Sequence, residues 1–460
     1  MARKRAVPHP PAAEFPILGN LDGLLSESEQ RDLAQAALGR PMKAVRLRPA
    51  AAQGRGEAAS LPFPTEPVPW FARGRFCTET HQPGRYLAHA AGDYFVQDAG
   101  SMLALALMDA QPHEWIADVC AAPGAKASAL LETVGPGGGF LLANEPIRGR
   151  LPALAYNLAR VGFPRCLLTA VDPERLDAVW IEAFDAVLVD APCSGQTLVG
   201  RGKQSKASFT ENQVTHSAAR QQRILAAAAR LVRPGGRLVY STCTFATEEN
   251  EEVIASFLQQ HARWEVEAVS HLEVWRSPRA PGGYRLYPNR DRCAGSYAVR
   301  LRQIDGSSTS MASVARAATV PLEDLRIAGE LVGKISPGSV VRHSTRWEAW
   351  PLALSPEIAR QAERLGLQGA EVAYQPGKHW MPSHALALRR DADWEPAEMF
   401  DLSDAQAQAY LQGHPLPTGP TGWCVAVWRG RPLGWLHGTA ARMNNSLPPA
   451  ARVPFSPEVG

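Results

Sequence analysis

Short apolar runs and amphipathic segments alternate through the middle of the chain. Residues 148–160 and 216–231 have helical character and lie between such runs. Strands that alternate with helices in this way favour a parallel sheet that is covered by helices on both faces. We therefore predict an α/β fold class for this region. The predicted strands are residues 115–120, 140–144, 166–171, 184–190, 237–241 and 297–301.

The N-terminal region has a different pattern. Residues 1–15 are rich in proline and alanine, which predicts disorder. Ser26 and Glu29 form a capping pattern ahead of a helix that we predict over residues 26–38. The stretch 49–69 is rich in alanine, glycine and proline, and it indicates a loop or connector.

The C-terminal region starts after a segment rich in serine and alanine that is typical of a linker. Short β-like runs at 423–428 and 432–436 indicate small α+β or barrel-like units. Inside the central region, Pro-Gly-Gly at 234–236 predicts a turn into the next strand. The predicted domains are residues 1–85, 86–303 and 323–460, with the linker at 304–322.

The composition indicates a soluble globular protein. Of the 460 residues, 45% are hydrophobic and 20% are charged, and no apolar run approaches the ~18 residues of a membrane span. The basic N-terminus lacks the apolar segment of a signal peptide. Seven scattered cysteines without a CxxC spacing predict neither a disulfide framework nor structural zinc. We therefore expect a cytoplasmic monomer without a bound metal.

The net charge of +3 permits an acidic partner without requiring one. Nearly all of the basic residues are arginines. This preference either reflects the codon usage of a GC-rich genome or serves phosphate contact and base stacking.

A loop rich in small residues follows the first predicted strand. Asp118-Val-Cys-Ala-Ala-Pro-Gly-Ala-Lys126 precedes a helix, so its backbone can approach a ligand closely. It matches neither GxGxxG nor a phosphate-binding Gly-Lys-Ser/Thr loop, and a structural turn explains it equally well. Glu145 and Asp172 end the next two strands, where they can bind ribose and adenine groups or simply be solvated and cap a helix. Three such strand ends together indicate a nucleotide-type pocket.

Two cysteines follow predicted strands, in Asp190-Ala-Pro-Cys193-Ser-Gly and Ser241-Thr-Cys243-Thr. Strand ends of an α/β sheet face one crevice, so both thiols can reach one site. Carbon 5 of cytosine becomes nucleophilic after a thiolate adds to C6, while an acid such as Asp190 stabilises N3 and a base later removes the C5 proton. This chemistry allows either cysteine as the nucleophile. The cysteines outside any motif are expected to be buried: Cys77, Cys166, Cys293 and Cys424.

This set of motifs resembles the NOL1/NOP2/Sun family of RNA 5-methylcytosine methyltransferases. The resemblance runs from about residue 93 to residue 302 and includes Ser-Thr-Cys-Thr-Phe-x-x-Glu-Glu-Asn around Cys243. The segments 382–388 and 430–435 resemble the bacterial subgroup that methylates small-subunit (16S) rRNA near the decoding site. The resemblance implies a Rossmann-like seven-stranded methyltransferase core, a small N-terminal α+β domain, and C-terminal α+β and PUA-like domains that contact RNA.

The resemblance also implies S-adenosylmethionine as the cofactor and small-subunit rRNA or the 30S subunit as the partner. It makes Cys243 the nucleophile that attacks C6, Cys193 the residue that assists release of the methylated base, and Asp190 a third catalytic residue. The cofactor-binding residues that it implies are Cys120, Ala121, Ala122, Pro123, Gly124, Ala125, Lys126, Glu145, Arg150, Asp172 and Asp190.

The chain departs from the family at two places. The family usually has Gly-Gly-Lys where this chain has Gly124-Ala125-Lys126, and an added methyl group at a point of close approach weakens cofactor binding. The second departure is the loop after Cys193, which lacks the family's usual acidic-Gly-x-x-Arg continuation. Lys203 and Lys206 in this loop are either RNA contacts or surface residues.

Three other functions are considered. The first is the same chemistry on tRNA or on another rRNA site. The second is an assembly factor that binds rRNA with little catalysis. The third is a redox role for Cys193 and Cys243, which their sequence contexts disfavour because they lack a CxxC motif.

Overall fold

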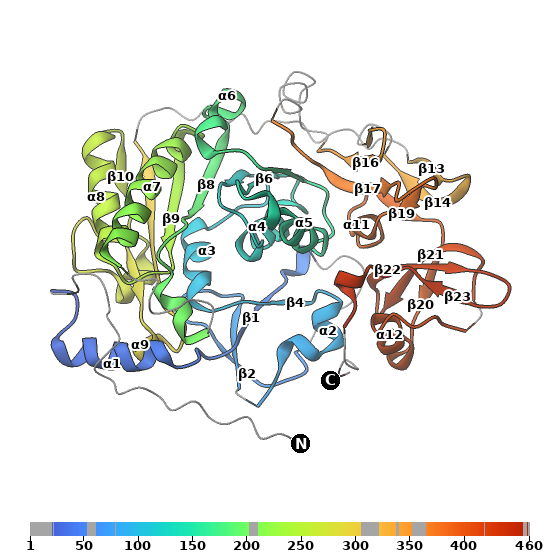
Figure 1. Ribbon diagram of the computed structural model, residues 1–460, viewed down its shortest axis with the longest axis horizontal. Coiled ribbons are helices and arrows are strands. Elements are labelled where there is room, and N and C mark those ends of the chain that lie inside the picture. Colours follow the sequence, from blue (N-terminus) through green and yellow to red (C-terminus); the bar gives the residue numbers. More distant parts are fainter. Residues whose placement is uncertain are drawn as a thin grey trace.

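The computed structural model describes residues 21, 23–52, 61–78, 80–201, 210–304, 322–336, 340–351, 365–417, 419–453 and 458. The segment expected to be disordered, at residues 1–15, lies outside the described residues, and so does most of the predicted linker. Figure 1 shows a central sheet flanked by helices, with the N-terminal elements along its lower edge and the C-terminal sheets beside it. Within the described residues, no helix is long and apolar enough to cross a membrane.

The central sheet confirms the predicted α/β fold class. Its strand order is β10-β12-β9-β8-β5-β6-β7, and β11 (Tyr284–Leu286) pairs with β12 beside this path. Strands β5 to β9 run parallel to one another. Strand β12 pairs antiparallel with β9, and β10 pairs antiparallel with β12 at that side of the sheet. The strands are β5 (Trp115–Asp118), β6 (Phe140–Asn144), β7 (Cys166–Thr169), β8 (Phe184–Asp190), β9 (Val232–Thr242), β10 (Trp264–Val266) and β12 (Ser296–Gln303).

Alternate residues of each buried strand point to opposite faces of the sheet, so both faces are apolar, and helices cover both. Ile116 of β5 lies in one core and Ala117 in the other. Helices α3 (Leu103–Met108), α4 (Ala125–Val134) and α5 (Leu151–Ala159) pack in the first core. Helices α6 (Asp177–Trp180), α7 (Glu211–Ala229) and α8 (Glu251–Gln260) pack in the second.

The predicted turn at 234–236 is wrong. Strand β9 begins at Val232, so these residues lie inside the strand and not ahead of it. Val232 pairs with Phe184 and Arg237 with Ala186, which leaves the residues between them as an irregularity in the β8–β9 register. Gly235 has a φ of 72°, and this left-handed conformation allows the chain to bulge and then resume pairing.

The N-terminal elements form a helix and a small sheet. Helix α1 (Glu27–Leu38) begins with the predicted capping box between Ser26 and Glu29. The sheet has the order β2-β3-β1-β4. Part of the expected connector is a strand, because β2 pairs with β3. The strands are β1 (Ala44–Leu47), β2 (Thr65–Pro67), β3 (Gly74–Cys77) and β4 (Tyr94–Val96).

The C-terminal region contains three small sheets, with α11 (His384–Ala387) and α12 (Asp404–Leu411) packed against them. The two β-like runs recognised in the sequence become β21 and β22, which pair antiparallel. The sheets are β13 (Glu323–Ile327), β14 (Glu330–Ile335) and β19 (Trp394–Pro396); β15 (Val340–Arg342), β16 (Arg346–Ala349), β17 (Ala370–Tyr374) and β18 (Met381–Pro382); and β20 (Met399–Asp401), β21 (Gly422–Trp428), β22 (Arg431–Gly438) and β23 (Met443–Asn445).

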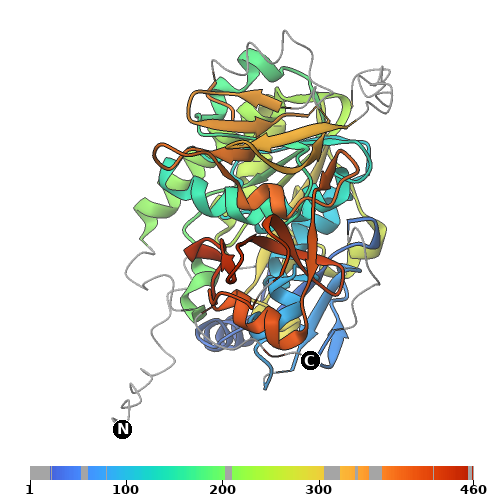
Figure 2. The ribbon, with the colours of Figure 1, turned by 90° about the vertical axis from the view of Figure 1, so that its right-hand side faces the viewer.

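The C-terminal region also contacts the N-terminal part of the chain. Arg431 donates to Asp93 at 2.5 Å, and both side chains are buried. The backbone N–H of Glu458 donates to the carbonyl of Arg85 at 2.8 Å. Figure 2 shows the C-terminal elements lying across the side of the α/β part.

Candidate active site

The carboxyl ends of the parallel strands surround a cavity of about 260 Å³. The loops after β5, β6, β7, β8 and β9 all contribute residues to its wall, and helix α7 completes it. The sequence-predicted residues that line it are Cys120, Ala122, Glu145, Arg150, Asp172, Asp190, Cys193 and Cys243.

The two motif cysteines meet in this cavity. Their Sγ atoms lie 2.9 Å apart, and the backbone N–H of Cys243 points at the sulfur of Cys193 from 3.3 Å. The hydrogen bond between the two thiols, together with burial, raises the pKa of the Cys193 thiol well above its ordinary value, although the backbone N–H of Cys243 acts in the opposite direction. The four cysteines expected to be buried are buried, and all seven cysteines are free thiols.

Glu249 ties the Cys193 loop to its surroundings. Its Oε2 accepts the backbone N–H of Ser194 at 2.9 Å and the side-chain amide of Gln221 at 2.8 Å. Glu249 is fully buried, and burial raises its pKa. The sequence placed Glu249 in the cysteine motif without giving it a role, because only the fold brings it beneath the Cys193 loop.

Asp190 is held between two donors. Lys126 Nζ donates to its Oδ2 at 2.7 Å, and the Ser241 hydroxyl donates to its Oδ1 at 2.8 Å. Lys126 does not line the cavity itself, but it binds Asp190, which does. The arrangement fixes the carboxylate beside the two thiols.

The loop from Cys120 to Lys126 shapes the floor of the cavity. Cys120 and Ala122 line it, whereas the backbone of Ala121 is tied to Asn144 by a 2.8 Å hydrogen bond. Gly124 has a φ of 108°, and a Cβ there would lie 3.1 Å from the Cβ of Asn157. Asn157 also donates to the carbonyl of Pro123 at 2.7 Å.

Ala125, the departure from the family pattern, is the first residue of α4 and does not line the cavity. Alanine is favoured over glycine within a helix. The added methyl group therefore does not obstruct the cavity.

Arg46 of β1 supports this loop from the N-terminal sheet. Its guanidinium donates to the carbonyl of Ala125 at 2.7 Å and to Glu132 of α4 at 2.9 Å. Arg46 is fully buried, and this burial lowers its pKa to about 10. The N-terminal sheet thus contributes a charge directly behind the loop.

Glu145 and Arg150 connect the second strand end to the same loop. The carboxylate of Glu145 accepts the N–H of Ile147 and a guanidinium N–H of Arg150, each at 2.9 Å. Arg150 also donates to the carbonyl of Ala122 at 2.6 Å. Asp172 lines the cavity and also accepts the N–H of Glu174, which is the helix cap considered above.

These residues fit S-adenosylmethionine. Two carboxylates, those of Glu145 and Asp190, line the cavity. Among the described residues, Glu145 is paired with Arg150 and Asp190 with Lys126. Such surroundings favour a cationic sulfonium group. Glu145 also keeps lone pairs that can accept hydroxyl groups of a ribose.

Asp118 is buried at the end of β5 and was not predicted as a site residue. Burial, followed by the charge of Asp190, raises its pKa from 3.8 to about 8. The unfolded chain ionises Asp118 near its ordinary pKa, while the folded protein keeps the proton. The wild type is therefore expected to lose stability relative to Asp118→Asn as the pH rises from 5 to 8, by at most about 1.4 kcal/mol per unit.

Denaturant unfolding of both proteins at pH 5, 6.5, 8 and 9 measures this difference. Above pH 8 it should stop growing, because Asp118 is then ionised in both states. Other titrating groups cancel in the comparison. A difference that stays constant from pH 5 to pH 9 would contradict the assignment.

Two arginines of α7, Arg220 and Arg223, line the cavity and were missed by the sequence analysis. Arg223 lies 3.6 Å from Glu174. Their spacing puts them on one face of the helix, but the sequence does not show which face looks toward the strand ends. Lys203 and Lys206, considered as RNA contacts, lie outside the described residues.

Comparisons with known proteins agree with this geometry. Residues 105–302 match a family described as 16S rRNA methyltransferase RsmB/F, and residues 397–453 match a family described as methyltransferase RsmF PUA domain. Ribosomal RNA small subunit methyltransferase F of Erwinia tasmaniensis is 30% identical over 408 residues, which cover 83% of this chain and 84% of that protein. The protein of the same name from Klebsiella pneumoniae is also 30% identical, and the match covers 83% of each chain.

Solved structures show a similar fold. A methyltransferase homologue from Pyrococcus horikoshii has a TM-score of 0.52 and 25% identity, covering 61% of this chain and 92% of its own. NSun6 from the same organism, solved with SFG, has a TM-score of 0.51 and 17% identity, covering 62% of this chain and 97% of its own.

Proposed function

The chain belongs to the RsmB/F family of 16S rRNA methyltransferases, and from this premise we propose that it methylates C5 of a cytosine in 16S rRNA near the decoding site. Membership confirms the family that the motifs indicated and, with it, S-adenosylmethionine as the cofactor. The C-terminal match confirms the expected PUA domain. We propose that the protein acts as a cytoplasmic monomer on rRNA or on the 30S subunit.

The observation that carries cytosine C5 chemistry is the pair of thiols beside a fixed carboxylate. Cys193 and Cys243 lie 2.9 Å apart, and Asp190 lines the same cavity. Modification at C5 of a pyrimidine needs a sulfur nucleophile, because the ring carbon is otherwise unreactive. Methylation of a ring nitrogen or of a ribose hydroxyl requires no thiol.

Each residue has a distinct part in the proposed reaction. The choice of Cys243 as the nucleophile follows the family resemblance, and the raised pKa of the Cys193 thiol agrees with it. Cys243 attacks as a thiolate, after a base has taken the proton of its thiol. Its sulfur bonds to C6, which moves the electrons of the C5–C6 double bond toward N3, where the Lys126–Asp190 pair stabilises them. These electrons then return to bond carbon 5 to the methyl group. A base removes the C5 proton, the electrons of that C–H bond restore the C5–C6 double bond, and the C6–S bond breaks with its electrons on sulfur, a step that Cys193 assists.

The cofactor is held by the loop from Cys120 to Lys126, together with Glu145, Arg150, Asp172 and Asp190. When bound, S-adenosylmethionine supplies the electrophilic methyl group that carbon 5 takes up. The target cytosine must be unstacked so that both faces of its ring are accessible, which favours an irregular or flipped-out nucleotide.

The position of Ala125 weakens the assembly-factor alternative, because that alternative was suggested by its methyl group. Ala125 begins a helix and lies outside the lining of the cavity. A methyl group there leaves cofactor binding intact, so catalysis is the better explanation of the site.

Transfer of labelled methyl groups from S-adenosylmethionine tests the proposed function. Unmodified 16S rRNA, 30S subunits and tRNA serve as substrates, and the labelled nucleoside is identified. We expect 5-methylcytidine in 16S rRNA or in the subunit. Label in tRNA alone would show that tRNA, and not 16S rRNA, is the substrate. Label in a nucleoside other than 5-methylcytidine would overturn cytosine C5 methylation. No label in any of the substrates would favour the assembly factor.

A further inference from the structure

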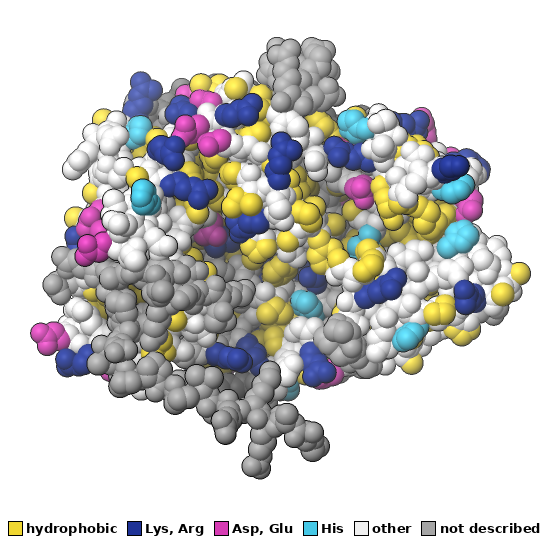
Figure 3. All heavy atoms as spheres, viewed as in Figure 1, with side chains coloured by type: hydrophobic (Ala, Val, Ile, Leu, Met, Phe, Trp, Pro, Cys, Tyr) yellow, Lys and Arg dark blue, Asp and Glu magenta, His cyan; other side chains and the backbone are white. Residues whose placement is uncertain are grey.

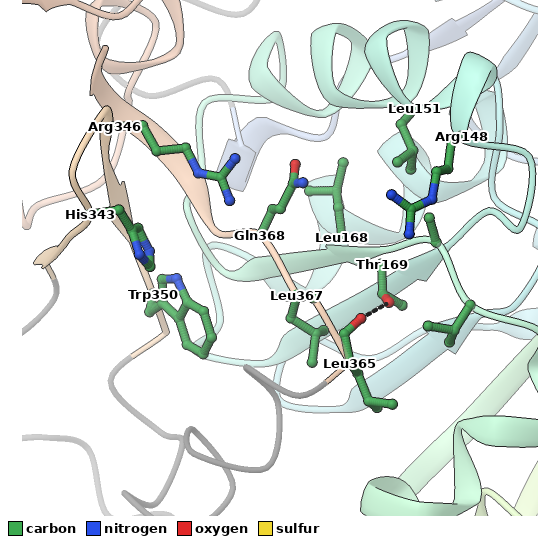
Figure 4. A pocket seen from close by; sticks show the side chains of 13 residues that line it. Arg148, Leu151, Leu168, Thr169, His343, Arg346, Trp350, Leu365, Leu367 and Gln368 are labelled. Carbon is green, nitrogen blue, oxygen red and sulfur yellow. Dashed lines mark hydrogen bonds between the residues drawn. The ribbon is translucent and has the colours of Figure 1, made fainter. Parts of the chain in front are cut away.

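The edge of the central sheet is covered by the C-terminal region. Leu168 of β7 and Gln368 exchange two backbone hydrogen bonds of 2.8 Å, and the Thr169 hydroxyl donates to the carbonyl of Leu365 at 3.1 Å. Trp350 and Leu367 are part of the same core as the sheet. Figure 4 shows these residues converging from the two parts of the chain. This attachment fixes the C-terminal region against β7.

A second cavity, which we call the sheet-edge pocket, opens beside this attachment. It has a volume of about 660 Å³, and its wall includes Arg148, Thr169, His343, Arg346, Trp350 and Gln368. No acidic side chain is among the described residues that line it. Arg148 and Arg346 extend toward one another from opposite sides in Figure 4.

The charge of the sheet-edge pocket stays positive after its ion pairs are counted. Arg346 is paired with Glu348, a buried side chain behind the wall, and His343 lies 3.8 Å from the same carboxylate. Arg148 is exposed, and it has no ion pair or side-chain hydrogen bond within the described part of the chain. Figure 3 shows lysine and arginine side chains spread over the upper half of this face, from the α/β part to the C-terminal sheets.

The sheet-edge pocket and the active site share one wall. Arg148 and Arg150 belong to the same turn, η5 (Arg148–Arg150), and Arg150 lines the active site while Arg148 lines the pocket. Val171 lines the pocket, and the next residue, Asp172, lines the active site. A strand of RNA that reaches the cysteines therefore has a cationic recess directly beyond the cofactor-binding residues.

The lining favours a nucleotide over other anions. Arginine binds phosphate, and the side chain of Gln368 can hydrogen-bond to a base. Leu151 and Leu367 supply apolar walls for a base, and the volume falls within the range of small-ligand sites. We propose that the sheet-edge pocket holds an unpaired nucleotide of the RNA substrate, at a position away from the target cytosine. The proposal rests on RNA methylation as the proposed function.

Arg148→Ala tests the pocket, because this exposed side chain can be removed without breaking a contact in the described part of the chain. We expect the Kd for 16S rRNA to rise about fivefold and the salt dependence of binding to fall by about one phosphate contact. The affinity for S-adenosylmethionine should not change. Arg175→Ala is the matched control, since Arg175 is an exposed arginine of the neighbouring turn η6 (Pro173–Arg175) and lines neither cavity.

Photo-crosslinking of 4-thiouridine-substituted rRNA to the wild type adds a second measurement. Crosslinks to peptides that contain Arg148, His343 or Trp350 support the proposal. It is overturned if Arg148→Ala binds rRNA like the wild type and no crosslink falls in these peptides. If the wild type itself neither binds nor methylates rRNA, both the pocket and the proposed function fail. If the wild type methylates normally, an Arg148→Ala variant that binds rRNA like it, together with no crosslink in these peptides, rejects the pocket alone.

Discussion

Replacing Cys243 with alanine is expected to lower the rate of methyl transfer to rRNA by at least about 10³-fold. The variant retains Asp190, Lys126 and the cofactor loop, so it should still bind S-adenosylmethionine with the affinity of the wild type. Without the sulfur, however, nothing adds to C6, and carbon 5 stays unreactive. Transfer of labelled methyl groups, with cofactor binding measured in parallel by calorimetry, separates these two effects.

Replacing Cys193 with alanine is expected to have a different effect. Cys243 can still attack, but release of the methylated base slows, so a covalent protein–RNA adduct should accumulate and survive a denaturing gel. The double variant without either sulfur should form no adduct. The roles exchange if methyl transfer survives in Cys243→Ala and is lost in Cys193→Ala. An adduct that persists in the double variant would exclude both cysteines as nucleophiles.

Replacing Arg46 with methionine is expected to lower the free energy of unfolding by about 3–5 kcal/mol. Arg46 and Glu132 form a buried ion pair, and Arg46 also bonds to Gln97 and Ser128. The variant would leave Glu132 with only Arg73, which lies 3.1 Å away and is partly exposed. Chemical denaturation of the wild type and the variant measures the difference.

Two further variants show whether the loss comes from the unpaired carboxylate. Arg46→Met combined with Glu132→Leu should recover much of the stability, because no charge is then left buried without its partner. Arg75→Met is the control from the adjacent strand, since Arg75 donates only to nearby carbonyls of Ala72 and Gly74. An Arg46→Met protein as stable as the wild type would contradict the buried pair.

Arg46 also makes a separate prediction about the cofactor. Its hydrogen bond to the carbonyl of Ala125 holds the start of α4, next to the loop that we propose binds S-adenosylmethionine. The variant is expected to raise the KM for the cofactor while leaving the Kd for rRNA unchanged. An equal loss of both would indicate general unfolding instead of loop positioning.

The central strands could be predicted because their signal is local. Residues 140–144 and 184–190 are apolar runs that end in polar residues, and they match β6 and β8. The bulge in β9 could not, because Pro-Gly-Gly usually ends a strand and only the neighbouring strand allows β9 to continue past it. Strand β2 was missed for a related reason, since three residues carry too little pattern without their partner β3.

The proposed catalytic motif could be recognised in the sequence, whereas the buried residues that support it could not. Acids and thiols at strand ends follow one another at recognisable positions, so Cys193, Cys243 and Asp190 stand out. Arg46 is one arginine among many, and its burial depends on a contact with Ser128, 82 residues away in the sequence. Glu249 and Arg220 likewise need the packing of η9 (Thr247–Glu249) and α7 to be known.

Contacts join the N-terminal, α/β and C-terminal parts pairwise: Arg46 with Glu132, Gln368 with Leu168, and Arg431 with Asp93. These contacts hold the three parts of the chain in one arrangement. Because its parts are already in place, binding does not pay the entropic cost of bringing them together. Under the proposed function, an RNA bound by the C-terminal sheets could present a cytosine to Cys243 only if its own contour spans the distance between them. Selection of the target then rests on the shape of the folded RNA as well as on the identity of the base.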